Sequence, residues 1–93
     1  MVAWDVLAWT LYRSGDRGPN DPVFIMVLED PHMDNEYLVT HLADILNRSE
    51  EWAQSKVWEI HENLRAIVYE GPYEPVEHYC KLLLRAQIAA LPV

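Results

Sequence analysis

The residues best suited to chemistry in this chain are its histidines, its one cysteine and the acidic pair that follows its most apolar run. The histidines are His32, His41, His61 and His78. None of them stands in HxxxH or HExxH spacing. His32 and His61 could meet in the fold, with Glu29 or Asp30 as a third ligand, so a small metal-binding protein is one alternative.

Motifs for nucleophilic or phosphate chemistry are missing. The sequence holds 3 glycines, so it contains no GxGxxG, no P-loop and no GxSxG. Cys80 falls on the apolar side of a predicted helix, where packing is favoured over a nucleophilic role. We therefore predict a protein that is not an enzyme and that needs no cofactor or metal.

Glu29 and Asp30 stand directly after the apolar run Val23–Leu28. Carboxylates at the end of a buried strand are well placed to receive a cation, although a solvated loop before a helix cap is the alternative. The chain has 15 acidic and 7 basic residues and a formal net charge of −8. Nucleic acids and anionic membrane surfaces are bound through clustered Lys and Arg, so this balance argues against both. It favours a cationic partner.

The elements that must position these residues are predicted from periodicity and caps. Val23–Leu28 is a run of six apolar residues, typical of a buried central strand. Asp34 and Ser49 are candidate N-caps of two helices. Apolar residues recur at helical spacing in each of them: Leu38, Leu42, Ile45 and Leu46 in the first, and Ala53, Val57 and Ile60 in the second.

The second half of the chain repeats this alternation. Asn63 tolerates the left-handed conformation and is expected to end the second helix. Arg65–Glu70 is predicted as a strand, Pro75 as the first position of a third helix, and Gln87–Leu91 as a closing edge strand. The order β-α-α-β-α-β favours an α+β fold with a small antiparallel three-stranded sheet and helices packed on one face.

A chain of 93 residues is long enough for one domain. We assign residues 23–93 to this domain and residues 1–22 to an N-terminal extension and linker. The extension is apolar from Val2 to Tyr12, and Ser14–Pro22 has the glycines and prolines of an exposed connection. No run approaches the roughly 18 apolar residues of a membrane helix. A single cysteine fits a reducing compartment, so we expect a cytoplasmic protein.

Several short stretches, taken in order, resemble the ClpS family, which are adaptors that deliver substrates to the Clp AAA+ proteases. The stretches are Leu28-Glu29-Asp30, Glu36-Tyr37-Leu38-Val39, Ala53-Gln54, Ile60-His61 and Val76-Glu77-His78-Tyr79-Cys80. The resemblance runs without a gap from about Val23 to Tyr79 and loosely on to Val93.

The resemblance implies an adaptor for N-degrons, which are substrates with a bulky hydrophobic N-terminal residue. In the family an Asn, an Asp and a His bind the substrate's α-amino group, and the matching positions are Glu29, Asp30 and His61. The family's pocket for the first side chain corresponds to Asn35, Leu38, Val57 and Ile60. Glu74 and Tyr79 lie where the family docks on the N-domain of a ClpA- or ClpC-like AAA+ unfoldase.

This chain departs from the family pattern at several positions. Glu29 replaces a neutral Asn, Asn35 replaces a common Met, and the glycine after the histidine turn falls near Leu64, with Asn63 expected in its role. One alternative is therefore a ClpS-like module that docks on the unfoldase but has lost N-degron binding. Another is a domain of similar topology, such as the C-terminal domain of the ribosomal stalk protein, whose lysine-rich docking helices this acidic chain lacks.

Overall fold

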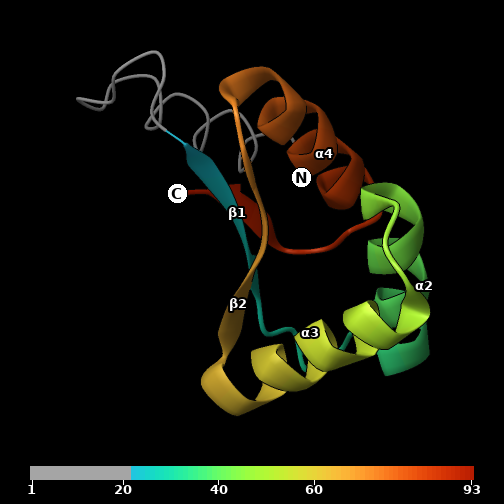
Figure 1. Ribbon diagram of the computed structural model, residues 1–93. Coiled ribbons are helices and arrows are strands. Elements are labelled where there is room, and N and C mark those ends of the chain that lie inside the picture. The colour runs from blue at the N-terminus through green and yellow to red at the C-terminus, as the bar shows by residue number, and fades with distance from the viewer. Residues whose placement is uncertain (1–21) are drawn as a thin grey trace.

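The computed structural model describes residues 22–93, so the predicted N-terminal extension, with its apolar Val2–Tyr12 and its linker, lies outside the described residues apart from Pro22. The elements follow one another as β1 (Val23–Leu28), α2 (Asn35–Leu46), α3 (Glu50–Asn63), β2 (Arg65–Gly71), α4 (Tyr73–Arg85) and β3 (Ala90–Pro92) (Figure 1). This order confirms the predicted β-α-α-β-α-β fold.

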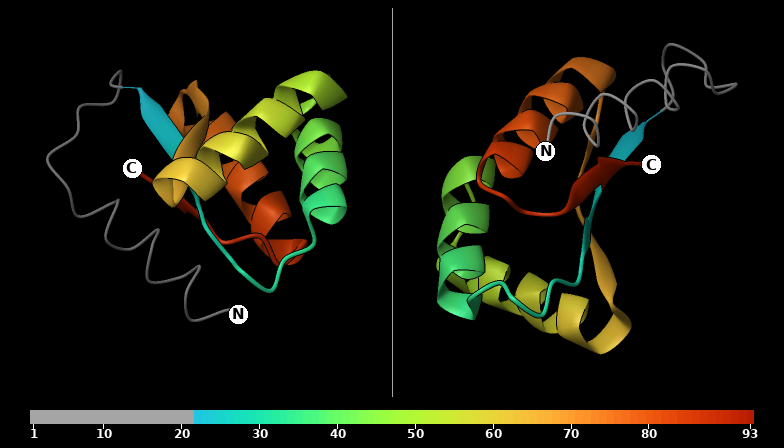
Figure 2. Two further views of the ribbon diagram at one scale, coloured as in Figure 1. Left: turned by 90° about the horizontal axis from the view of Figure 1, so that it is seen from below. Right: turned by 180° about the vertical axis from the view of Figure 1, so that it is seen from behind.

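The sheet has the strand order β2-β1-β3, and both pairings are antiparallel. β1 is thus the central strand, as its apolar run predicted. It pairs with β2 from Val23↔Gly71 to Leu28↔Arg65, and the register shifts once between Ile25 and Met26. The helices gather on one side of this sheet (Figure 2), which also agrees with the prediction.

The core lies between the sheet and the three helices. Val23, Ile25 and Val27 point into it from β1 and are at most 1% exposed. No polar or charged side chain is buried among the described residues. Cys80 of α4 is fully buried in the core, in line with a packing role. The helices add further buried apolar residues: Leu38, Val39, Leu42, Leu46, Ala53, Val57, Ile60, Val76 and Leu83.

The first two helices begin where their caps were predicted. The Asp34 carboxylate accepts the Tyr37 backbone N–H at 3.1 Å, and the Ser49 hydroxyl accepts the Trp52 N–H at 3.1 Å. Each bond satisfies one of the N–H groups that a helix leaves unpaired in its first turn.

The ends of the other elements differ from the predictions. α3 continues through Asn63, and Leu64 takes the left-handed conformation with φ 68°. Pro72 is the N-cap of α4, so Pro75 is the third helical residue, still in the first turn where its missing N–H costs nothing. The last strand begins at Ala90, because Gln87 turns the chain with φ 66°.

The left-handed conformation of Leu64 is unfavourable for a residue with a Cβ atom, and Leu64 is 66% exposed. Replacing Leu64 by Gly removes a conformational strain of about 1–2 kcal/mol. Part of this gain is offset, because glycine raises the conformational entropy of the unfolded chain. We expect Leu64→Gly to raise the free energy of unfolding, measured in urea, by about 0.5–1 kcal/mol. Leu64→Ala is the control: it keeps the Cβ, so a gain equal to that of Gly would contradict the strain.

Candidate functional site

The candidate site forms where the end of β1 meets the last turn of α3. Glu29 is the first residue after β1, and its backbone N–H donates to the Leu64 carbonyl at 2.9 Å. This bond ties the strand end to the turn between α3 and β2. The Glu29 side chain is thereby held beside His61, one turn back along α3.

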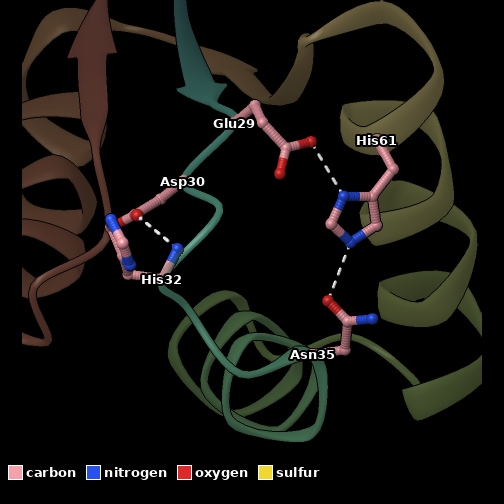
Figure 3. Close-up of polar contacts among 5 residues, drawn as sticks. All are labelled: Glu29, Asp30, His32, Asn35 and His61. Atoms are coloured by element: carbon pink, nitrogen blue, oxygen red, sulfur yellow. Dashed lines mark hydrogen bonds and ion pairs between the residues drawn. The ribbon is translucent and has the colours of Figure 1, made fainter.

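His61 lies between two polar side chains from two other parts of the chain (Figure 3). Its Nδ1 is 2.8 Å from Oε2 of Glu29, and its Nε2 is 2.7 Å from Oδ1 of Asn35, the first residue of α2. The side chains of His61 and Glu29 are 37% and 21% exposed. The site is a partly open polar cluster of three residues from three parts of the chain. We call Glu29, Asn35 and His61 the His61 cluster.

The chemistry of the groups assigns donors and acceptors in the His61 cluster. An ionised carboxylate only accepts, so Nδ1 of His61 carries a proton that it donates to Glu29. A protonated ring also donates from Nε2 to the Asn35 oxygen. A neutral ring accepts at Nε2 and is satisfied when the Asn35 amide presents its NH₂, since amide oxygen and nitrogen are exchanged by a flip.

Asp30 does not join the His61 cluster. Its Oδ1 accepts the His32 backbone N–H at 3.0 Å, and its carbonyl accepts the Met33 N–H at 3.0 Å. Its side chain points to the opposite side of the loop from Glu29 (Figure 3). There it borders a second depression of about 550 Å³, which it shares with His32 and Arg85. Of the three amine-binding positions that the resemblance implies, the structure brings two together.

The metal alternative is not supported by this arrangement. His32 lies on the Asp30 side of the loop, away from His61 (Figure 3). Among residues 22–93, no group of three or more His, Cys, Asp or Glu side chains could hold a metal ion.

An open cavity of about 810 Å³ lies between α2 and α3, and two residues of the His61 cluster, Asn35 and His61, line it. Val57 of α3 also lines it; the resemblance assigned Asn35 and Val57 to a pocket for the first side chain of a substrate. Leu38 and Ile60 do not line it: they are 6% and 1% exposed and belong to the core. Their helices turn both side chains into the core, and their assignment to the pocket stays a prediction.

Trp58 is a residue of this cavity that the sequence did not identify. It is 68% exposed, and it lines the cavity together with Val39 and Gln54. The sequence signal that identifies Trp58 as a neighbour of His61 is helical spacing. Gln54, Trp58 and His61 lie at i, i+4 and i+7 and so share one face of α3.

Tyr37 separates the two depressions, since it lines both. Its hydroxyl donates to the Ala86 carbonyl at 2.7 Å, which joins the first turn of α2 to the end of α4. Its ring stacks on His41 with 3.9 Å between ring centroids, and Nδ1 of His41 donates to the Tyr37 carbonyl at 2.9 Å. Tyr37 therefore holds the cavity wall in place from two sides.

The residues implied in unfoldase docking lie on α4, apart from the His61 cluster. Glu74 is exposed in the first turn, while Tyr79 is half-buried with its ring 4.9 Å from that of Tyr69. Five positions on a helix place them about 140° apart around its axis. Of the two, Glu74 is the one whose side chain is free to meet another protein's surface.

The fold and the site define a small α+β binding domain, with a polar cluster beside an open cavity and no catalytic arrangement of nucleophile and base among its described residues. A family model, the ATP-dependent Clp protease adaptor protein ClpS, matches residues 19–92. The chain belongs to the ClpS family. ClpS adaptors are non-catalytic, so the protein is an adaptor of a Clp protease and not an enzyme, and family membership implies a Clp unfoldase as its partner.

Among solved structures, the chain is similar to the ClpS2 protein of Agrobacterium tumefaciens, determined with L-phenylalaninamide bound. The TM-score is 0.68 at 14% sequence identity, and the match covers 82% of this chain and 98% of the other. At this identity the likeness supports the fold. No curated protein sequence gives a significant match. No helix of the described part has the length and apolar character needed to cross a membrane.

The contact with Glu29 should set the tautomer of His61. Free histidine favours the proton on Nε2, whereas the Glu29 carboxylate holds it on Nδ1. In ¹⁵N spectra of histidine-labelled protein at alkaline pH, we expect the Nδ1–H form for His61, changing to Nε2–H in Glu29→Ala. His41 is an internal control, because its Nδ1 faces a backbone carbonyl in both proteins. A His61 signal that is the same in both would show that Glu29 does not orient the ring.

Proposed function

We propose that the protein binds the free amino terminus of polypeptides with a bulky hydrophobic first residue and delivers them to a Clp-type unfoldase in the cytoplasm. One observation carries this proposal: oxygen atoms of Glu29 and Asn35 lie 2.8 and 2.7 Å from the two ring nitrogens of His61, and His61 itself lines an open cavity.

The chemistry of the His61 cluster matches an α-ammonium group. An ammonium has three donors and no acceptor, so it needs oxygens or a neutral imidazole nitrogen around it. Glu29 supplies two carboxylate oxygens and the negative charge, and Asn35 supplies an amide oxygen. An ammonium can donate to these oxygens, and a neutral His61 ring accepts a further N–H at the nitrogen that carries no proton.

The cavity beside the cluster offers apolar contact for the first side chain. Val39 and Val57 are nearly buried at its floor, and Trp58 is exposed at its edge. A bulky side chain placed here gains about 25 cal/mol for each Å² of apolar surface removed from water. The ClpS2 structure supports this ligand class, because L-phenylalaninamide carries a free α-amino group and an aromatic side chain.

Delivery follows from holding substrate and unfoldase at once. Tethering a substrate raises its effective concentration at the unfoldase without any new contact between the two. We assign docking to the exposed part of α4 around Glu74 and, with it, Tyr79, which leaves the His61 cluster available to the substrate.

A second candidate is a module that docks on the unfoldase without binding N-degrons. The observation in its favour is that both oxygens of the His61 cluster already have a partner in His61, while Asp30 is bonded within its own turn. An amine must then displace bonds that already exist.

Peptide binding tests the first candidate against the second. Peptides that begin with free Leu, Phe, Tyr or Trp should bind, and their N-acetylated forms and a peptide that begins with Ala should not. Acetylation removes the charge and two donors, which should cost about 1–3 kcal/mol of binding free energy. Glu29→Ala and His61→Ala should each weaken binding about tenfold or more by calorimetry. Glu62→Ala, an exposed carboxylate beside His61 on α3, is the control and should bind normally.

Equal affinity for free and acetylated peptides, or normal binding by both Glu29→Ala and His61→Ala, would refute amine recognition. The docking-only module would then be the better description.

Docking gives an independent prediction. Glu74→Arg should weaken binding to the isolated N-domain of a Clp unfoldase, chiefly through a slower association rate, since charges at the rim of an interface act on association. Peptide affinity should stay unchanged in this variant. Glu70→Arg, an exposed carboxylate on β2, is the control for net charge. If both variants bind the N-domain equally well, the docking surface does not include Glu74.

A further inference from the structure

The central strand β1 is apolar on both of its faces. Val23, Ile25 and Val27 point towards the helices, so Phe24, Met26 and Leu28 point the other way, because side chains alternate along a strand. An antiparallel sheet with one face in water normally alternates apolar and polar residues. The unbroken run of β1 instead indicates a strand that is covered on both sides.

The neighbouring strands extend this second apolar face. Ile67 of β2 and Leu91 of β3 flank Met26 in register. Val93 lies beside Phe24, with which it exchanges two backbone hydrogen bonds of 3.0 and 2.8 Å. We call this set the outer face; it consists of Phe24, Met26, Leu28, Ile67, Leu91 and Val93. Charged side chains occur only at its ends on β2, where Arg65 pairs with Leu28 and Glu70 with Phe24.

The described helices leave the outer face uncovered. All three pack on the opposite side of the sheet (Figures 1 and 2). Ile67 is 37% exposed, and the other five side chains are half-buried. Six contiguous apolar side chains on one sheet face are more than scattered surface residues and mark an interaction surface.

We propose that the outer face is covered by the segment Val2–Tyr12 of the same chain. All residues of this segment except Asp5 and Thr10 are apolar, and two of them are tryptophans. The segment lies outside the described residues, and residues 13–22 connect it to β1, the central strand of the outer face.

The length of the connection suits this placement. Ten residues span at most about 33–36 Å when extended, and a six-residue strand is about 20 Å long. The connection can therefore carry the segment back along the whole of β1. Its glycines and prolines, Gly15, Gly18, Pro19 and Pro22, suit a reversal of direction.

Its covalent connection to β1 favours Val2–Tyr12 over a second copy of the protein as the occupant of the outer face. A covalent connection of only ten residues gives the segment an effective concentration in the millimolar range at the outer face. A second copy would have to reach that concentration in solution against the repulsion between two chains of net charge −8. The segment has one acidic residue, Asp5, and meets no such barrier.

Limited proteolysis of the intact chain tests the proposal. Chymotrypsin cleaves after aromatic residues, and Trp4, Trp9 and Tyr12 provide three sites within the segment. We expect cleavage there, followed by mass spectrometry, to be at least about tenfold slower than in a free peptide of residues 1–13, because a docked segment is cleaved only when it opens. Ile67→Lys and Met26→Lys each place a charge on the outer face and should restore rapid cleavage.

Trp58→Lys is the matched control, since it places the same charge on an exposed aromatic position of α3 and should leave the protection unchanged. Far-UV circular dichroism establishes that each variant is folded, and the exposed Ile67 is the substitution least able to disturb the core. Rapid cleavage in the intact wild-type chain overturns the proposal, as does protection that persists in both lysine variants. Protection that is lost on dilution, with elution as a dimer, assigns the outer face to a second copy instead.

Discussion

The central position of β1 is the constraint on which the rest of the structure depends. This strand must pair along both edges and bury Val23, Ile25 and Val27 in the core. Its direction then determines where its end lies, beside the last turn of α3. The 2.9 Å bond from the Glu29 N–H to the Leu64 carbonyl closes this junction. The His61 cluster is therefore supported by the packing of the whole sheet, although its own contacts are partly exposed to water.

Two departures from the family pattern meet at one imidazole ring. By the resemblance, Glu29 and Asn35 correspond to a neutral Asn and a common Met of the family, and in the structure they contact the two nitrogens of the same His61. A partly exposed pair of this kind adds only about 0–1 kcal/mol to stability. Its main effect is to hold the ring in one orientation and to gather oxygen atoms around it. The two substitutions thus act together, and the charge that Glu29 introduces has a defined partner.

Local signals predicted the elements well where neighbouring residues decide the outcome. Asp34 and Ser49 cap their helices because a side-chain oxygen reaches an N–H only three residues away. α3 ends at Asn63 as predicted, but the left-handed residue at its end was predicted wrongly, for the opposite reason. Asn63 has the better intrinsic preference for a left-handed turn, but Leu64 takes that conformation where its carbonyl meets the Glu29 N–H, 35 residues back along the chain.

The sequence by itself determined the family, the order of the elements, the central strand, and the candidates Glu29 and His61, because periodicity, caps and motif order are properties of residues close together in the chain. Only the tertiary structure decided which candidates meet. It joined Asn35 to His61, left Asp30 in its own turn, buried Leu38 and Ile60, and brought Trp58 to the cavity. These outcomes depend on how α2 and α3 rotate about their axes to fit the sheet. That rotation is set by packing between residues distant in the chain, which no local pattern records.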